Sequence, residues 1–547
     1  MTAAQNWRRG IDVQVKTAIA LGCMALSGPL TAWAATPPST ETATANLAKA
    51  GSIERFDLAQ LADGINDGAL NSEAITSAYL ARIAAIDDSG PTLNAVIATF
   101  PDAMDQARAM DTELRAGKYR GPMHGLPVLV KDNIEVAGPL PTTAGSLALA
   151  ANVTNRDAPL IARLRAAGAV ILGKTNLSEW ANIRSNNSTS GWSAVGGLTK
   201  NPHALDHNSC GSSSGSGSAM AAGLAAATIG TETDGSITCP AGVNGVVGFK
   251  PTVGLVSRRY VVPISHSQDT AGPITRSVRD AAIMLTAMAG SDPQDAATAD
   301  ADKWRGDYSQ GLSADALKGM RIGVLRAPDV DAALFDGALA KLRAGGAEIV
   351  MLDGSKIDRQ KIGEGEYKVL LAELKADLAI YLQGLPDGLV PHKSLADIIA
   401  FNTANADKEL QHFGQEIFET ADKENGLDDP AYVEALATSR GLASDALNQL
   451  FAHNKVDVII AQTNGPAWVS TLGKGDAFSG PSASQLPAVA GFPHLTVPMG
   501  LSAGLPVGLS FIGPNWHDHA VLKAGYAYEQ LSKARVAPQF RATLESK

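Results

Sequence analysis

From about residue 125 onward, short apolar runs alternate with longer stretches in which apolar residues recur at helical spacing. A short continuous apolar run between turn residues is typical of a buried strand, whereas an amphipathic helix repeats its apolar positions every three or four residues. The alternation predicts an α/β protein, in which helices cover a central sheet. The runs that predict strands are 128–130, 170–172, 321–325, 349–352 and 456–460.

Two regions show the spacing of helices. The pair Asn71-Ser72 is a good helix start, and the apolar residues that follow it fall on one face, at Ile75, Tyr79, Ile83 and Ile86. The second region, about 355–450, is more charged, and we expect it to lie over one face or end of the sheet and to line the entrance to a site. Its apolar stripe, which we interpret as core packing, consists of Val369, Leu370, Leu374, Leu378 and Leu382.

The first 34 residues have the pattern of a secretory signal peptide. Arg8, Arg9 and Lys16 precede an apolar stretch over 17–33, and Ala32-Trp33-Ala34 fits a cleavage site. Glycine, serine and proline interrupt the apolar stretch, and its length barely reaches a membrane span, which favours a signal peptide over an anchor. We therefore expect a periplasmic or secreted protein without a stable membrane anchor after processing, and a flexible leader over 35–50.

Composition narrows the class of partner. With 547 residues, 45% of them hydrophobic, the chain is long enough to bury a large core. The formal net charge is −10, and no basic run extends beyond Arg258-Arg259, so the sequence lacks the electrostatic footprint of a nucleic-acid-binding protein. We expect no nucleic-acid partner, and the oligomeric state stays open.

The candidate chemistry lies in two glycine-flanked serine clusters. Residues 210–217 read C-G-S-S-S-G-S-G, and residues 230–236 read G-T-E-T-D-G-S. A serine hydroxyl is a poor nucleophile unless a base and an oxyanion site surround it. Neither cluster contains a histidine, but Lys131 ends the apolar run that begins at Gly125. Lys131 is therefore the candidate base, since burial lowers the pKa of a lysine.

These segments resemble the amidase signature family. The resemblance covers a lysine in a G-x-P-x-x-x-K-D segment, a Gly-Ser-Ser cluster and a G-T-D-T-G-G-S-like turn, and it continues through Asp269-Thr270-Ala271-Gly272-Pro273 to the C-terminus. It implies one large α/β domain over 51–547, with a mixed central sheet covered by helices on both faces. Within it, the signature core spans about 121–290 and a sheet-completing part spans about 451–547.

The resemblance also implies the roles of individual residues. Ser236 attacks the amide carbonyl, Ser212 passes the proton to Lys131, and the Gly211–Ser212 peptide bond is cis. The backbone N–H groups of Thr233, Asp234, Gly235 and Ser236 form the oxyanion hole, and neither cofactor nor metal is needed. Taken alone, the residues leave plainer alternatives open, which are an ion pair between Lys131 and Asp132 and a structural turn at Ser236.

Three other motifs point to different chemistry. Residues 168–175 fit the P-loop spacing, but their middle is an apolar strand that cannot wrap a phosphate. Residues 211–215 fit G-x-S-x-G with Ser213 as nucleophile, a scheme that needs a later histidine and leaves Lys131 and Ser236 unexplained. His517-Asp518-His519 suggests a metal site, yet no third ligand is spaced nearby. We favour none of the three.

Departures from the family pattern bear on the substrate. Thr238 stands where members that act on acidic substrates have an arginine, Asp234 replaces a glycine, and Glu232 replaces an aspartate. With the leader, this variant resembles bacterial peptide amidases, which implies an exported amidase that releases ammonia from C-terminal amides of peptides through an acyl-enzyme. Alternatives are aryl-acylamide, oligoamide or fatty-amide hydrolysis, an amidotransferase A-type subunit, or a non-catalytic binding protein.

Cys210 and Cys239 flank the proposed serines, and Cys23 leaves with the leader. An exported protein can pair such cysteines, but two small buried thiols are the plainer expectation. The sequence does not give the distance between them.

Overall fold

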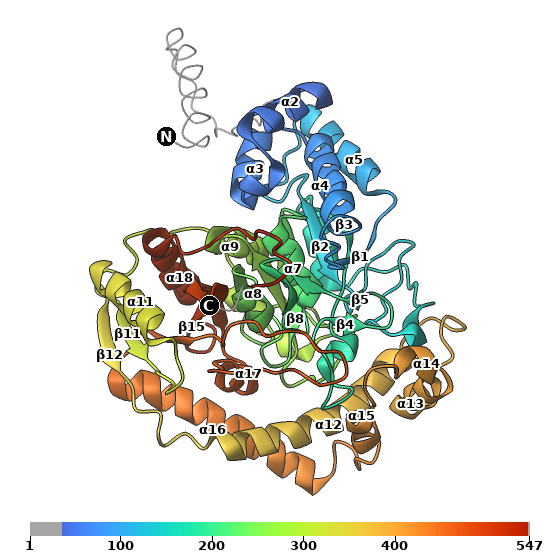
Figure 1. Cartoon of the computed structure of the whole chain (residues 1–547), viewed down its shortest axis with the longest axis vertical. Coiled ribbons are helices and arrows are strands. Elements are labelled where there is room, and N and C mark those ends of the chain that lie inside the picture. The colour runs from blue at the N-terminus through green and yellow to red at the C-terminus, as the bar shows by residue number, and fades with distance from the viewer. Residues whose placement is uncertain (1–35, 545–547) are drawn as a thin grey trace.

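The computed structural model describes residues 36–544 and has an eleven-stranded sheet at its centre (Figure 1). All five predicted strands are present, although β13 begins two residues later than expected. In spatial order the strands are β1 (Val96–Thr99), β3 (Val170–Thr175), β2 (Pro127–Lys131), β8 (Ala227–Glu232), β10 (Thr270–Thr275), β9 (Val247–Lys250), β14 (His494–Ser502), β15 (Leu505–Ile512), β13 (Val458–Gln462), β11 (Arg321–Val324) and β12 (Glu348–Met351).

The sheet is mixed, as expected. Strand β2 is parallel to both β3 and β8, and β11 is parallel to β12 and β13, whereas the other pairings are antiparallel. Since parallel strands end at the same edge of a sheet, the segments that follow β2, β3 and β8 meet there. Two small ribbons lie outside the sheet, β4–β5 (Trp192–Ser193, Gly197–Leu198) and β6–β7 (Lys200–Asn201, Ala204–Asn208).

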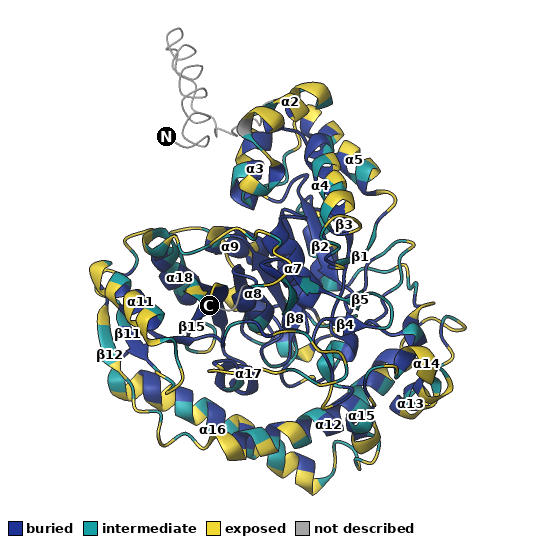
Figure 2. Ribbon diagram, in the orientation of Figure 1, coloured by how far each residue is buried: buried dark blue, intermediate teal, exposed yellow. Residues whose placement is uncertain are grey.

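Helices surround this sheet and bury it (Figure 2). Helix α7 packs on β2, β3, β8 and β10, while α9 packs on β9 and β10. The helices are α2 (Thr40–Ala50), α3 (Leu58–Asn66), α4 (Ser72–Ile86), α5 (Ala103–Arg115), α6 (Pro159–Ala166), α7 (Ser214–Ala222), α8 (Thr238–Val243), α9 (Val278–Met288), α10 (Ala301–Trp304), α11 (Ala332–Ala344), α12 (Arg359–Gln383), α13 (Leu395–Ala404), α14 (Ala406–Glu409), α15 (Glu416–Ala421), α16 (Pro430–Asn454), α17 (Gln485–Ala490) and α18 (Asp518–Ser532).

The expected flexible leader over 35–50 is wrong for most of its length, because α2 occupies it. The Ser39 hydroxyl accepts a hydrogen bond from the Thr42 N–H and caps the helix. Ala43 and Leu47, four residues apart, are buried, and α2 packs against α4. The prediction for α4 is confirmed: Asn71 is its N-cap, and Ile75, Tyr79 and Ile83 are buried.

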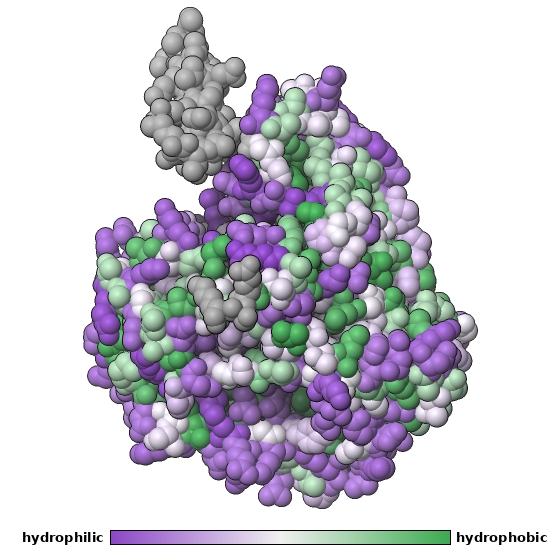
Figure 3. Space-filling model, viewed as in Figure 1, coloured by the Kyte–Doolittle hydropathy of each residue, from purple (hydrophilic) through white to green (hydrophobic). Residues whose placement is uncertain are grey.

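Helices α12 and α16 form the predicted helical region and run side by side along one rim of the molecule (Figure 1). They are antiparallel, since Gly365 lies against Ser439 and Glu373 accepts a hydrogen bond from Tyr432. Val369, Leu374, Leu378 and Leu382 are buried as expected. Hydrophilic residues predominate on the outer side of this rim on the face shown in Figure 3.

The predicted signal peptide, residues 1–34, lies outside the described residues. Within 36–544, none of the helices has the length and apolar character needed to cross a bilayer.

Candidate active site

The sheet edge after β2, β3 and β8 brings the predicted site residues together. Lys131 is the last residue of β2, and the neighbouring strand β8 ends at Glu232, just before the turn that carries Ser236. Ser212 lies immediately before the N-cap of α7, the helix that packs on both strands. Lys131 Nζ lies 2.7 Å from Ser212 Oγ.

Lys131 is fully buried, and its hydrogen bonds go to neutral oxygens. Besides Ser212 Oγ, its Nζ contacts Thr231 Oγ1 at 2.8 Å and the Thr231 carbonyl at 3.3 Å. Burial lowers the pKa of Lys131 to about 7, against the opposing charges of Asp269 and Glu232. A large fraction of this lysine is therefore neutral near pH 7, which allows it to accept a proton.

The plainer alternative, an ion pair between Lys131 and Asp132, is wrong. Asp132 Oδ1 lies 3.1 Å from Lys174 Nζ, and the other carboxylate oxygen of Asp132 accepts hydrogen bonds from Thr143. Lys174 also donates to the Ile134 carbonyl at 2.6 Å. Lys174 thus ties β3 to the segment that follows β2. Its segment is the buried strand β3, paired on both sides, which has no room for the phosphate loop that the motif suggests.

Ser212 differs from the serines that follow it. Ser213 Oγ donates to the Thr231 carbonyl at 3.1 Å, and Ser214 Oγ donates to the Cys210 carbonyl at 2.5 Å, so both hold the loop. Ser212 Oγ instead contacts Lys131, and the Gly211–Ser212 peptide bond is cis, as the resemblance implied. A side chain at Gly211 would meet Ser178 Oγ at 2.1 Å and would have to displace that hydroxyl, which binds the Gly191 N–H.

No histidine supports the alternative with Ser213 as nucleophile. Among the described residues, His494 Nε2 lies 2.6 Å from Ser510 Oγ, His519 contacts the Gln310 carbonyl and His517 contacts the Asn515 carbonyl. Asp518 is buried and accepts hydrogen bonds from Thr252. The side chains of His517, Asp518 and His519 thus bind different groups and do not act together as the ligands of one metal ion.

Ser236 lies in the turn between β8 and α8. Its carbonyl accepts a hydrogen bond from the Ser213 N–H at 3.2 Å, which holds the turn against the loop that carries Ser212. The Ser236 residue is 9% exposed. The N–H groups of Thr233, Asp234, Gly235 and Ser236 find no hydrogen-bond acceptor among the described residues. Four such donors in one tight turn are suited to binding an oxyanion.

The turn itself is held from two sides. Gly235 has φ +79°, a conformation that favours glycine, and the Ser484 side chain lies close behind it. The Glu232 carboxylate accepts hydrogen bonds from the N–H groups of Ile237 and Thr238, at 2.8 and 3.0 Å. Glu232, which departs from the family pattern, therefore caps α8 and fixes the exit of the turn.

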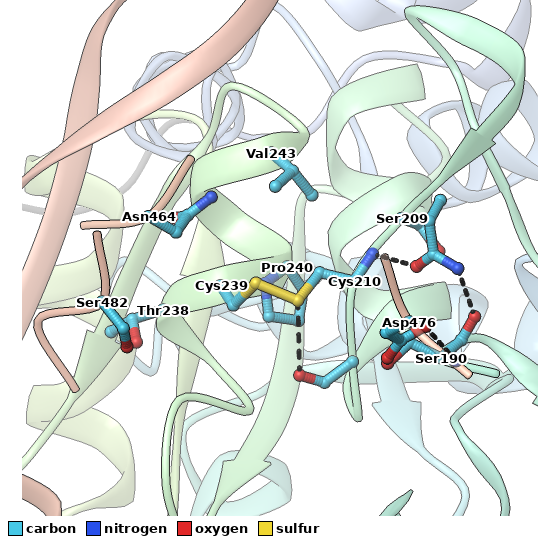
Figure 4. Close-up of a disulfide and its surroundings, with 12 residues drawn as sticks. Ser190, Ser209, Cys210, Thr238, Cys239, Pro240, Val243, Asn464, Asp476 and Ser482 are labelled. Atoms are coloured by element: carbon cyan, nitrogen blue, oxygen red, sulfur yellow. Dashed lines mark hydrogen bonds between the residues drawn. A yellow bond between two sulfur atoms is a disulfide. The ribbon is translucent and has the colours of Figure 1, made fainter. Parts of the chain in front are cut away.

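A disulfide joins Cys210 to Cys239, so the expectation of two separate thiols is wrong (Figure 4). Cys210 precedes Ser212 by two residues, and Cys239, in the first turn of α8, follows Ser236 by three. Their Cα atoms are 6.0 Å apart. The bond was not predictable because the two cysteines lie 29 residues apart in sequence and only the folded sheet edge brings them together.

Several residues of the site were missed in the sequence. Asn133 Nδ2 donates to Thr231 Oγ1 at 2.9 Å and so fixes the hydroxyl that contacts Lys131. Asp269 Oδ1 accepts from Thr233 Oγ1 at 2.6 Å, and burial raises the pKa of Asp269 to about 6. Thr231 and Asp269 lie within segments that resemble the family pattern. The motifs point to these segments but do not indicate which contacts the two side chains make.

A cavity of about 370 Å³ lies next to the site, on the side of α12. Apolar and aromatic side chains of Tyr260, Val261, Ile380 and Tyr381 line it, together with paired arginines. It shares Arg258, Val261 and Asp269 with a much smaller cavity that Thr231 and Thr233 line. The room beside the site therefore lies between the sheet edge and α12.

A mixed sheet that brings a buried lysine onto a serine beside a glycine-rich turn defines a class of hydrolase. The chain belongs to the amidase family, whose model matches residues 74–522. It is an amidase, an enzyme that hydrolyses the C–N bond of amides.

Known relatives cover nearly the whole chain. The crystal structure of native peptide amidase from Stenotrophomonas maltophilia is 49% identical, with a TM-score of 0.85, over 88% of this chain and 98% of that one. A probable amidase of Arabidopsis thaliana is 39% identical over 90% of this chain and 93% of its own length. The A-type subunit of the glutamyl-tRNA(Gln) amidotransferase of Moorella thermoacetica is 37% identical over 86% of this chain and 95% of its own.

Proposed function

We propose that the enzyme hydrolyses carboxamides through a triad of Ser236, Ser212 and Lys131. The observation that carries the proposal is the 2.7 Å contact between Ser212 and a buried lysine whose pKa is about 7. Neutral Lys131 accepts the Ser212 proton while Ser212 accepts the Ser236 proton, and Ser236 Oγ attacks the amide carbon. The proton then returns through Ser212 to the leaving nitrogen, which departs as ammonia and leaves an ester on Ser236.

Deacylation uses the same path in reverse. Water gives a proton to the Ser212–Lys131 pair, attacks the ester and releases the carboxylic acid, and the proton returns to Ser236. In both steps the carbonyl oxygen becomes an oxyanion, which the N–H groups of residues 233–236 stabilise. A single such donor is typically worth about 2.7–4 kcal/mol of transition-state stabilisation.

For the substrate we propose neutral carboxamides, most specifically the C-terminal amides of peptides. The 49% identity with a peptide amidase, one that has also been solved with the competitive inhibitor chymostatin, supports this choice. The surroundings of the turn support it as well. Thr238 binds Glu232 and offers no cation for an acidic substrate, and Asp234 adds an acidic group beside the turn.

We also propose that the enzyme is exported to the periplasm or secreted. The leader at 1–34 supports this, and so does the disulfide, because disulfides form and persist in oxidising compartments.

An amidotransferase A-type subunit is the second candidate, since one such protein is 37% identical. The two candidates differ in what the isolated chain does. Release of ammonia from simple amides by the isolated chain would favour the amidase and count against the amidotransferase subunit.

The test measures ammonia release from N-blocked dipeptide amides, the matching acids and a fatty amide, and aniline release from an anilide. We expect the wild type to release ammonia from the peptide amides and leave internal bonds intact. Ser236→Ala abolishes this activity, while Ser213→Ala, which removes only a hydroxyl bonded to backbone, retains it. Faster turnover of the anilide or fatty amide would contradict the substrate, and an active Ser236→Ala enzyme would contradict the mechanism.

A further inference from the structure

Helix α12 carries an acidic residue on its buried side. Glu366 is 6% exposed and lies four residues after Ile362 and three before Val369, both of which are buried. It therefore belongs to the stripe that packs against the rest of the molecule. A carboxyl group in that position needs specific partners, since burial without them is costly.

The partners of Glu366 lie in the oxyanion turn and behind it. Gln268 Nε2 donates to Glu366 Oε1 at 3.0 Å and to the Thr233 carbonyl at 3.2 Å. The carboxyl group of Glu366 also hydrogen bonds with that of Asp234 and with the side chain of Gln485. Glu366 thus connects α12 and α17 with Thr233 and Asp234, the two residues that share one peptide unit of the turn.

Two carboxyl groups can form a hydrogen bond only if one of them keeps its proton. Burial, and then the charge of Asp234, raises the pKa of Glu366 to about 8. Asp234 lies nearer the normal range, because burial, opposed by its hydrogen bond with Ser484, raises its pKa only to about 6. At neutral pH, Glu366 is therefore the proton donor and Asp234 the acceptor.

This arrangement fixes a peptide plane that the proposed reaction uses. The Thr233 carbonyl and the Asp234 N–H belong to one planar unit and point in opposite directions. When Gln268 holds the carbonyl from behind, the N–H is directed to the other side, where it has no acceptor among the described residues. The Asp234 side chain, bound to Glu366, prevents the unit from rotating.

We propose that Glu366 is a positioning residue of the oxyanion turn, which it holds by donating a hydrogen bond to Asp234 and by anchoring Gln268. The proposal rests on the proposed function, in which the Asp234 N–H binds the oxyanion. Once Glu366 ionises, two carboxylates face each other next to the oxyanion site. Their repulsion displaces the turn, and their charge opposes the oxyanion.

The other charges around the pair are few. Glu232 contributes a negative charge from the end of β8, Lys250 a positive one from β9, and Arg359 a positive one from the start of α12. Helix α17 contributes the neutral side chains of Ser484 and Gln485, and α16 places Ser439 behind the α12 backbone. Lys131 affects the acid side of the pH profile, because it accepts a proton only in its neutral form.

The first test is the pH dependence of kcat/KM for ammonia release from a neutral peptide amide. In the wild type we expect a decline above about pH 8, as Glu366 ionises. Glu366→Gln keeps a donor and an acceptor but cannot ionise, so it stays within about threefold of the wild type at pH 7 and loses this decline. Glu366→Ala lowers kcat by about 10–10²-fold with little change in KM, because a misplaced oxyanion donor acts in the transition state.

Glu364→Gln is the matched control, because Glu364 is exposed on the same helix and bonds only Gln360. It should keep the wild-type kcat and pH profile. The proposal is wrong if Glu366→Gln keeps the same alkaline decline, or if Glu366→Ala matches this control.

A second measurement needs no substrate. A carboxyl group whose pKa is about 8 in the folded state and about 4.5 when unfolded stabilises the folded state at low pH, and this stability is lost as pH rises between the two values. The unfolding midpoint of Glu366→Gln should therefore gain on the wild type from pH 5 to pH 8, and a constant difference overturns the proposal. If this gain appears but the wild type releases no ammonia from any amide, the proposed function fails while the hydrogen-bonded pair stands.

Discussion

At the scale of single residues, the groups in contact with a buried lysine decide its chemistry. Lys174 lies beside the Asp132 carboxylate and holds the floor of the site, whereas Lys131 meets only hydroxyl and carbonyl oxygens. With no carboxylate in contact with it, burial outweighs the charges of Asp269 and Glu232 and lowers the pKa of Lys131 to about 7. Two lysines at the ends of neighbouring strands thus have different chemistry.

The activity should therefore follow the neutral form of Lys131. Since this lysine is protonated below its pKa, kcat/KM should rise with pH through about 7, and Lys131→Ala should lower kcat by about 10²–10⁴-fold. Lys131→Arg should be as inactive, because a guanidinium stays protonated. Initial rates from about pH 5 to 9 measure the profile, and unfolding midpoints check that the variants fold. An active Lys131→Arg enzyme would exclude this role for the lysine.

The sequence predicted single residues only where a motif marked them. Lys131, Ser212 and the cis bond could be predicted because their segments resemble the family pattern. Glu366 could not, although its spacing from Ile362 and Val369 places it on a buried stripe. An acidic residue at such a position either lies at the exposed margin of the apolar stripe or is a buried carboxyl group with polar partners. Those partners, Asp234 and Gln268, come from a distant part of the sequence, and only the fold brings them close.

At the scale of elements, the apolar runs identified five strands and missed others that are fully buried, among them β8, β9 and β10. Strands β8, β9 and β10 contain Gly230, Gly248 and Gly272, where a neighbouring backbone or side chain lies too close for any side chain. Glycine and threonine interrupt the apolar pattern of these strands, so periodicity gives no signal. Helix α2 was missed for a related reason, since its alanines and threonines have few large apolar residues among them.

The disulfide links the segment before α7 to the first turn of α8, and each segment carries one of the two serines. Replacing both cysteines with alanine should lower the free energy of unfolding by about 3–4 kcal/mol, because the 29-residue separation sets the chain entropy that the bond removes. Urea unfolding of the double variant against the wild type measures this loss. Activity should fall as well, since the two serine segments lose a covalent constraint.

Thiol titration is the control for this prediction. In the wild type, unfolded without a reducing agent after removal of residues 1–34, no free thiol should react. Two reactive thiols per chain would show that Cys210 and Cys239 are not bonded.

At the scale of the whole molecule, the described chain forms one α/β domain, and the proposed signal peptide predicts that this domain is exported. We expect the protein recovered from the periplasm or medium to begin at Ala35, as determined by N-terminal sequencing and intact mass. Ala34→Arg should block cleavage and leave a longer chain with the membrane fraction, while an exposed change such as Glu364→Gln should be processed normally. A wild-type chain that starts at Met1 and stays in the cytoplasm would exclude export.

The hydrogen bond between Asp234 and Glu366 also has a consequence for how this enzyme can diverge. Every atom proposed to react lies between residues 131 and 236, whereas α12 and α16 come from a later part of the chain. Exchange of that later block between relatives should leave the reacting groups in place, provided that the contacts of Glu366 with Asp234 and Gln268 are kept. Position 234, a glycine in the common family pattern, and position 366 should therefore covary: where the aspartate is absent, the acid on the helix has lost its partner. A chimaera that inherits only one of the two would keep its fold and lose turnover.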